Sequence, residues 1–248
     1  MSNESVPRKI GVVTATSIVV ANIIGSGIFT TSGLMAARLP GPIWVIACWI
    51  FGGLIALTGA LCYAELATRM PEVGGEYVYL KKLYHPVFGF LTGWTSFFAG
   101  FSAPIASSAL AFVAYIFAGI APQLSNGDQN YFFLLKKGIA VSIILIFTML
   151  HYTGVRWGGR IQNVLTFVKI VIVLGLAGIG VFYGQGNWEH FTADISQSFS
   201  GMGFGTAMML VMFSYSGWNA SAYIAGEIKN PRRSLPVSLF VGTTIVII

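Results

Sequence analysis

Long apolar stretches recur along this chain and are separated by short polar segments. A helix that rises 1.5 Å per residue needs about 20 apolar residues to cross a hydrocarbon core of about 30 Å. The pattern predicts six spans and the start of a seventh, and therefore an all-α polytopic membrane protein. The predicted spans cover residues 10–37, 42–68, 87–120, 137–153, 161–183 and 201–228, with a seventh beginning near Leu235.

The first span is interrupted at its centre by Ile23-Ile24-Gly25-Ser26-Gly27-Ile28-Phe29. Glycine inside a helix costs about 1 kcal/mol relative to alanine, so this segment is a poor helix former. Within a bilayer, non-helical backbone is tolerated only where it is buried in protein or lines a cavity. The interruption therefore predicts a helix that opens in mid-membrane and offers its backbone groups as a binding site.

The sixth span repeats this interruption. The polar segment 214–219 (SYSGWN) separates apolar residues 208–213 from apolar residues 220–228. Serine and asparagine cap or turn helices rather than extend them. Two broken spans that lie five apart run in opposite directions, as in inverted-topology repeats. We therefore predict one permease domain over 1–248, with a first repeat over about 10–183 and the start of a second over about 201–248.

Charge distribution predicts the orientation of the chain in the membrane. Only 9% of the residues are charged and the mean hydropathy is +0.76, whereas soluble domains carry about 25% charged residues. If the N-terminus is cytoplasmic, ten of the 14 basic residues lie on the cytoplasmic side, three lie outside and one lies within a span. This is the positive-inside distribution, so the net charge of +6 reflects topology and not a nucleic-acid partner. The ten are Arg8, Lys9, Arg69, Lys81, Lys82, Arg156, Arg160, Lys229, Arg232 and Arg233.

Enzymatic chemistry has no support in the sequence. Cys48 and Cys62 lie 14 residues apart in one predicted span, about 21 Å along a helix, too far to form a disulfide or to share a metal ion. His85, His151 and His190 are scattered without metal-ligand spacing. No Walker loop or Ser-His-Asp arrangement is present. We expect neither a metal nor a cofactor.

Three segments carry a resemblance to a known family. They are Asn22–Phe29, Tyr63–Tyr77, and Phe213–Asn219 together with Glu227–Arg233. They resemble, in order and spacing, the amino acid–polyamine–organocation (APC) superfamily of permeases, and its L-type amino acid transporter branch in particular. The resemblance implies a LeuT-like inverted-repeat fold of ten core helices, usually twelve in all. The last apolar run, from Leu235, has only 14 residues, or about 21 Å of helix. We therefore expect an incomplete fold with spans 1–6 and part of 7, the front part of a longer protein.

The resemblance implies secondary active, sodium-independent transport of amino acids by alternating access, through exchange or proton-linked uptake. The half-helix that begins at Gly27 presents N–H groups that suit the substrate carboxylate, and carbonyls beside both breaks suit its ammonium group. The second break holds no charged residue, which favours neutral substrates. Phe213 is expected to act as an aromatic gate. The expected substrate-binding residues are Ile23, Gly25, Ser26, Gly27, Phe213, Ser214 and Ser216.

Two further sets of residues are candidates for coupling and gating. Lys169 is the one charged residue in the apolar run 164–174, and a charge inside a span is by default a functional hypothesis. The resemblance implies that it replaces a sodium ion between the first and fifth helices; proton coupling is a further hypothesis, and snorkelling toward the cytoplasm is the alternative. Glu65, Arg69 and Glu227 could form a cytoplasmic ion-pair gate, or could simply fix topology at the membrane interface.

The expected partners are a free amino acid and the lipid bilayer. The eukaryotic branch with a partner glycoprotein carries a cysteine between its third and fourth helices, and residues 121–136 contain none. We therefore expect no disulfide-linked heavy chain and a bacterial inner-membrane protein with a cytoplasmic N-terminus. Two alternatives remain at this point. One is a non-transporting amino acid sensor or channel on the same fold, and the other is a truncated, inactive permease fragment.

Overall fold

The computed structural model describes residues 8–120, 129–152, 155–184 and 200–248, and these are almost entirely helical. Within these ranges there is no β-strand, only two isolated β-bridges, Ile10 with Ile228 and Val73 with Ile224. The all-α prediction is confirmed. The elements are α1 (Val12–Ile23), α2 (Gly27–Ala36), α3 (Pro42–Arg69), α4 (Glu76–Leu83), α5 (Pro86–Thr95), the π-helix η1 (Ser96–Ser102), α6 (Ala103–Ile120), α7 (Gln129–Tyr152), α8 (Val155–Tyr183), α10 (Gly201–Ser214), α11 (Ala220–Tyr223), the 3₁₀-helix η3 (Ala225–Glu227) and α12 (Pro231–Ile247).

Five helical segments of the described chain are long and apolar enough to cross a membrane. α1 and α2 together form one of them, and α10 is a shorter apolar helix of 14 residues. Their lengths match the thickness of a hydrocarbon core, since 20 helical residues extend about 30 Å. The five segments are Val12–Ala36, Pro42–Arg69, Pro86–Gly119, Phe132–Leu150 and Val164–Tyr183.

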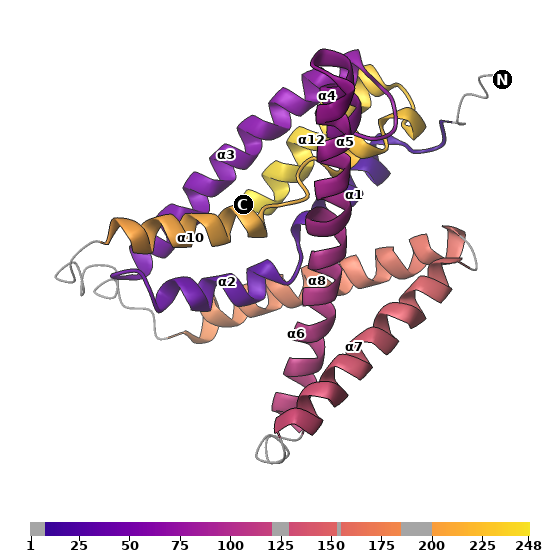
Figure 1. Ribbon diagram of the computed structural model, residues 1–248. Coiled ribbons are helices and arrows are strands. Elements are labelled where there is room, and N and C mark those ends of the chain that lie inside the picture. Colours follow the sequence, from indigo (N-terminus) through magenta and orange to yellow (C-terminus); the bar gives the residue numbers. More distant parts are fainter. Residues whose placement is uncertain (1–7, 121–128, 153–154, 185–199) are drawn as a thin grey trace. The chain divides into compact units, whose positions relative to one another are not determined.

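Both predicted breaks are confirmed. α1 ends at Ile23, and a short non-helical stretch leads into α2 at Gly27 (Figure 1). α10 ends at Ser214, and the chain turns through residues 215–219 before α11. The first break contains the glycine–serine segment, and the second contains Gly217 with φ of +102°, a left-handed conformation that favours glycine.

The segment after the second break differs from the sequence-based prediction. We predicted that the sixth span continues to residue 228, but α11 has only four residues and the 3₁₀-helix η3 has three. The backbone here bonds to another part of the chain. Ile10 N–H donates to the Glu227 carbonyl at 3.0 Å, and Lys229 N–H donates to the Ile10 carbonyl at 2.8 Å. These bonds flank Ile228, whose φ of −85° and ψ of 130° are an extended conformation that a continuing helix could not adopt.

Three helices start earlier than predicted, among them α12, which begins at Pro231 and not near Leu235, and the third predicted span contains an irregular turn. α7 begins at Gln129 and not at 137, and α8 begins at Val155 and not at 161. The third predicted span holds the π-helix η1 between α5 and α6. Pro104 follows η1 and has no N–H, which removes one helical hydrogen bond at that point. The first turns of α7 and α8 contain polar residues, so the apolar pattern did not predict them.

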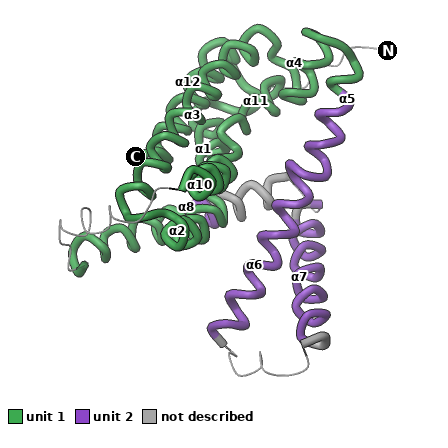
Figure 2. Tube along the Cα trace, turned by 60° about the vertical axis from the view of Figure 1, so that its left-hand side comes forward, with its two compact units in different colours: residues 1–89, 168–248 green, residues 90–167 purple. Residues whose placement is uncertain are grey.

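The chain divides into two compact units (Figure 2). Residues 90–167 form one unit, in which α6 packs against α7 through the buried side chains of Ala109, Val113 and Ala140. Residues 1–89 and 168–248 form the other, and this unit holds both breaks.

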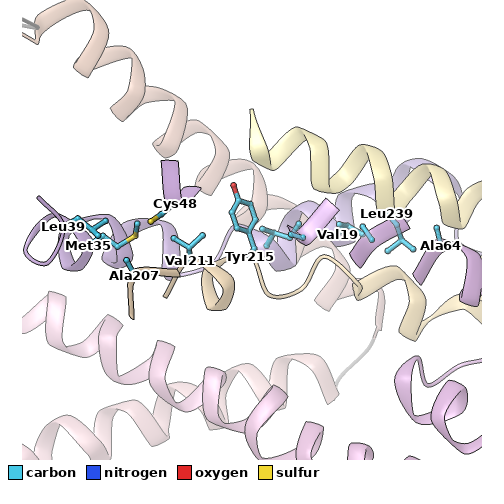
Figure 3. Packing of buried hydrophobic residues seen from close by; sticks show 12 residues of the cluster. Val19, Met35, Leu39, Cys48, Ala64, Ala207, Val211, Tyr215 and Leu239 are labelled. Atoms are coloured by element: carbon cyan, nitrogen blue, oxygen red, sulfur yellow. The ribbon is translucent and has the colours of Figure 1, made fainter. Parts of the chain in front are cut away.

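The core of the unit formed by residues 1–89 and 168–248 depends on close helix contacts. α12 packs against α1 and α3, and α10 packs against α2 and α3. Val19 and Leu239 are fully buried where α1 meets α12 (Figure 3). Gly242 allows this approach, because a Cβ atom on it would lie 2.8 Å from Cβ of Val19. Small residues let membrane helices approach closely, so that dispersion contacts hold them together.

We expect Gly242→Ala to destabilise the protein by about 1–3 kcal/mol, because the added methyl overpacks the contact with Val19. The matched control is Gly205→Ala in α10, where nothing lies within 4 Å and alanine improves helix propensity. Thermal unfolding of both variants in detergent checks this. Equal melting temperatures would contradict the packing described for α1 and α12.

Candidate functional site

The two breaks lie directly against each other, and a glycine on each side makes this possible. A Cβ atom on Gly27 would lie 2.6 Å from Oγ and 2.9 Å from Cα of Ser214. A Cβ atom on Gly217 would lie 2.8 Å from Cβ of Asn22 and 2.9 Å from its carbonyl carbon. Real Cβ atoms do not approach this closely, so the two segments touch backbone to backbone only because these positions are glycine.

A buried hydroxyl pair fastens the two broken helices beside this contact. The hydroxyl oxygens of Thr31 and Ser214 lie 2.8 Å apart, and the Ser214 hydroxyl also donates to the Leu210 carbonyl at 2.9 Å. Thr31 must therefore be the donor to Ser214. Both side chains are buried, at 3% and 8% exposure. Sequence reasoning missed Thr31, although it lies one turn after Gly27 on the same helix face.

The N-terminus of α2 presents backbone donors at the first break. Ser26 is the N-cap, and its side chain makes no capping bond. Phe29 N–H donates to the Ser26 carbonyl at 3.2 Å. In the described residues, no backbone acceptor bonds the N–H groups of Gly27 and Ile28. Free N–H groups and the positive end of the helix dipole together suit a carboxylate.

Of the three carbonyls predicted to bind the substrate ammonium group, two already accept a backbone hydrogen bond. The Ile23 carbonyl accepts from Gly25 N–H at 2.8 Å, and the Phe213 carbonyl accepts from Ser216 N–H at 3.1 Å. The Ser214 carbonyl has no such donor in the part of the chain that the structure describes. Ser214 is therefore the strongest of the three as an acceptor for a ligand.

The Lys169 side chain reaches the first break. Its ammonium group donates to the Ile24 carbonyl at 3.1 Å, across 145 residues of sequence. Lys169 is half-buried and lies in the middle of the 29-residue helix α8. A bond to the unwound segment, from the middle of a helix, supports the bridging hypothesis over snorkelling.

The predicted binding residues Gly25, Ser26, Phe213 and Ser216 are exposed or half-buried. The Phe213 side chain is 56% exposed, and Ser26 and Ser216 are also exposed. The space around Gly25 is open, since a Cβ atom added there would have only the Ile23 carbonyl oxygen nearby, at 3.9 Å. The structure thus brings Gly27 and Ser214 together, and it joins Phe213 to Ser216 through the backbone bond within the second break.

The three candidate gate residues do not form one cluster in the described chain. Arg69 and Glu65 form an ion pair with 2.6 Å between Nη2 and Oε1, one turn apart on α3, with both side chains largely exposed. Exposed pairs of this kind contribute about 0–1 kcal/mol. Glu227 lies in η3, and no hydrogen bond or ion pair joins its side chain to either residue among those described. The gate stays a prediction.

A partly buried carboxylate that sequence reasoning passed over lies close to the second break. Glu76 accepts hydrogen bonds from Tyr63, Asn219 and Tyr223. The signal for it was the Gly74-Gly75 pair that precedes it, which marks a tight turn. No three His, Cys, Asp or Glu residues in the described ranges gather so that they could hold a metal ion.

The profile of the amino acid permease family matches residues 10–248 of this sequence. The chain belongs to this family. Membership, together with the five apolar helical segments in the described part of the chain, makes this permease an integral, multi-pass membrane protein. The family consists of transporters and not of enzymes.

The chain is similar to curated proteins that are named as amino acid transporters or exchangers. It is 30% identical over 239 residues to the serine/threonine exchanger SteT of Bacillus subtilis, which covers 96% of this chain and 52% of SteT. It is 32% identical over 255 residues to the mouse b(0,+)-type amino acid transporter 1, covering 99% and 50%. It is 29% identical over 250 residues to the rabbit large neutral amino acids transporter small subunit 2, covering 96% and 45%. The chain spans about half the length of these relatives.

We expect Gly27→Ala to destabilise the permease by about 1–3 kcal/mol, because the methyl would push against the Ser214 backbone and separate the breaks. Gly33→Ala is the matched control, since it lies on the same helix with nothing within 4 Å. Thermal unfolding followed by size-exclusion chromatography measures both. A stable Gly27→Ala variant would contradict the contact between the breaks.

Proposed function

We propose that this permease is a secondary active transporter of amino acids, with neutral substrates, that works by alternating access around its two breaks. The observation that carries the proposal is the glycine-mediated contact between the breaks, beside free N–H groups at the start of α2. The names of the relatives, a serine/threonine exchanger and a large neutral amino acids transporter subunit, support the substrate class.

In this proposal the substrate carboxylate binds the N–H groups at Ser26, Gly27 and Ile28. The absence of Cβ atoms at Gly25 and Gly27 lets the carboxylate approach the backbone. The ammonium group binds carbonyls beside the breaks, that of Ser214 foremost. The Ile23 and Phe213 carbonyls already accept backbone hydrogen bonds within the two breaks, so in this proposal they fix the shape of the site and do not bind the ammonium group. The Phe213 ring covers the substrate. Ser216 lies exposed next to this space.

Lys169 takes the place of a coupling cation in the proposed mechanism. Its ammonium group already binds the Ile24 carbonyl in the first break, a position that a sodium ion coordinated by backbone oxygen would occupy. A fixed positive charge there stabilises the open helix end without an ion from solution. Transport is then independent of sodium and proceeds by exchange or by proton-linked uptake.

The proposed setting is a bacterial inner membrane with the N-terminus in the cytoplasm. The basic residues support this orientation. We further propose that residues 10–183 form a first repeat and that residues 201–248 begin a second, inverted one. Because residues 121–136 contain no cysteine, we propose that the protein works without a disulfide-linked heavy chain.

Uptake by proteoliposomes tests the proposed function. The protein is reconstituted in the length in which cells make it, and labelled serine is competed with a panel of neutral, acidic and basic amino acids. We expect saturable uptake, competition by neutral amino acids and an unchanged rate when choline replaces sodium. Steep conductance without saturable uptake would favour a channel, and a requirement for sodium would contradict the role of Lys169.

Lys169→Met removes the charge and keeps a side chain of similar length, so we expect uptake to fall by about tenfold or more through loss of a charged hydrogen bond at the first break. Lys229→Met is the control, because Lys229 is exposed and lies outside the spans. Initial uptake rates, normalised to reconstituted protein, measure the effect. A Lys169→Met variant as active as the control would contradict the cation role.

A further inference from the structure

Glu76 accepts hydrogen bonds from α3, from the turn before α11 and from α11 itself, all in the same compact unit. Its Oε1 accepts from the Tyr63 hydroxyl of α3 at 3.1 Å and from the Asn219 side-chain amide at 2.6 Å. Its Oε2 accepts from the Tyr223 hydroxyl of α11. An ionised carboxylate only accepts hydrogen bonds, so this one side chain satisfies three donors that are 13, 143 and 147 residues away in sequence.

The local sequence explains why Glu76 is in this position. Gly74 and Gly75 have φ of +129° and +52°, and they turn the chain sharply after α3. A Cβ atom on Gly75 would lie 2.9 Å from the ring of Tyr223, so only glycine lets the turn approach α11. Glu76 is then the first residue of α4, where the helix dipole favours a negative charge.

No positive charge neutralises Glu76 in the described part of the chain, where the two ion pairs join Arg69 to Glu65 and Lys82 to Glu72. A partly buried carboxylate without a cation depends on its hydrogen bonds, and charge-assisted bonds are about twice as strong as neutral ones. The three donors are therefore held firmly in place by Glu76.

Further contacts join the same loop to the segment after the second break. Gly74 N–H donates to the Tyr223 carbonyl at 2.9 Å, and Val73 forms an antiparallel bridge with Ile224. The Tyr63 ring meets the Trp218 ring edge to face, with 4.9 Å between centroids. The Tyr79 side chain lies one turn after Glu76 on α4. Its burial, and to a lesser extent the negative charge of Glu76, raise the pKa of Tyr79 to about 12.

The network ends two residues from the contact between the breaks. Asn219 bonds Glu76, and Gly217 lies against Asn22 in the last turn of α1, just before the first break. A shift of Asn219 would therefore change the position of the second break relative to the first. Among the described residues, the hydrogen bonds of Glu76 go to Tyr63, Asn219 and Tyr223, and none of these three is among the residues proposed to bind the substrate.

We infer that Glu76 is a positioning residue for transport, which fixes the second break and α11 to the loop after α3 and so preorganises the substrate site. The inference rests on the proposed function for its kinetic consequence, since a site held in its binding geometry spends less binding free energy on ordering. Without the Glu76 carboxylate, the second break and α11 become more mobile. Substrate affinity then falls more than the maximal rate does.

Transport kinetics test the inference with Glu76→Gln, Asn219→Ala and Tyr223→Phe, and with the double variants that combine Glu76→Gln with each of the others. We expect each single change to raise KM by about tenfold with a smaller change in the maximal rate, as expected from the loss of a bond to a charged group. The double variants should raise KM less than the product of the singles, because the residues act as one network. The control is Glu72→Gln, an exposed carboxylate four residues away that bonds Lys82.

Hydrogen–deuterium exchange provides a readout that needs no substrate. We expect Glu76→Gln and Tyr223→Phe to raise deuterium uptake in residues 215–228 and to leave the middle of α3 unchanged. If the wild-type protein shows no transport, the proposed function fails while exchange still tests the network. The inference would be overturned if the Glu76→Gln variant showed the same KM and the same deuterium uptake as the Glu72→Gln control. Should Glu76→Gln not fold, Tyr223→Phe decides: unchanged KM and exchange in that variant overturn it.

Discussion

Backbone groups that leave a helix inside a membrane must find partners in the protein or in a ligand, and this constraint governs the structure around both breaks. The two breaks meet it in part by lying against each other. Gly27 against Ser214 and Gly217 against Asn22 bring main chain to main chain, with no room for a Cβ atom at either glycine. The rest of the unit, from the Thr31–Ser214 bond to the packing of α10 on α2 and α3, depends on this approach.

Several polar groups around the breaks already have partners within the protein, which reduces the number of backbone groups that a ligand can bind. Turns within each break use the Ile23 and Phe213 carbonyls, Lys169 uses that of Ile24, and the Ser214 hydroxyl bonds its own helix. In the described residues, the N–H groups of Gly27 and Ile28 and the Ser214 carbonyl are among the backbone groups at the breaks that have no backbone partner. A donor set with an acceptor beside it suits the carboxylate and the ammonium group of the zwitterion proposed as substrate.

Sequence alone was sufficient for features set by local chemistry. Glycine and serine within an apolar run predict the break at residues 23–27, and a single charge in an apolar span singles out Lys169. Features that depend on distant residues could not be predicted. The bonds between Ile10 and residues 227–229 end the sixth span early, and Glu76 gains its partners from residues up to 147 positions away. Thr31, one turn beyond Gly27, was missed because threonine in an apolar helix has no distinctive pattern.

The central claim is that the first N–H groups of α2 bind the carboxylate of an amino acid held between the two breaks. An experimental structure of the permease with a neutral amino acid bound tests it most directly. The account predicts carboxylate oxygens about 3 Å from the backbone nitrogens of Gly27 and Ile28, with the ammonium group beside the Ser214 carbonyl. An amino acid bound elsewhere, or unbroken helical hydrogen bonding through residues 23–27, would contradict it.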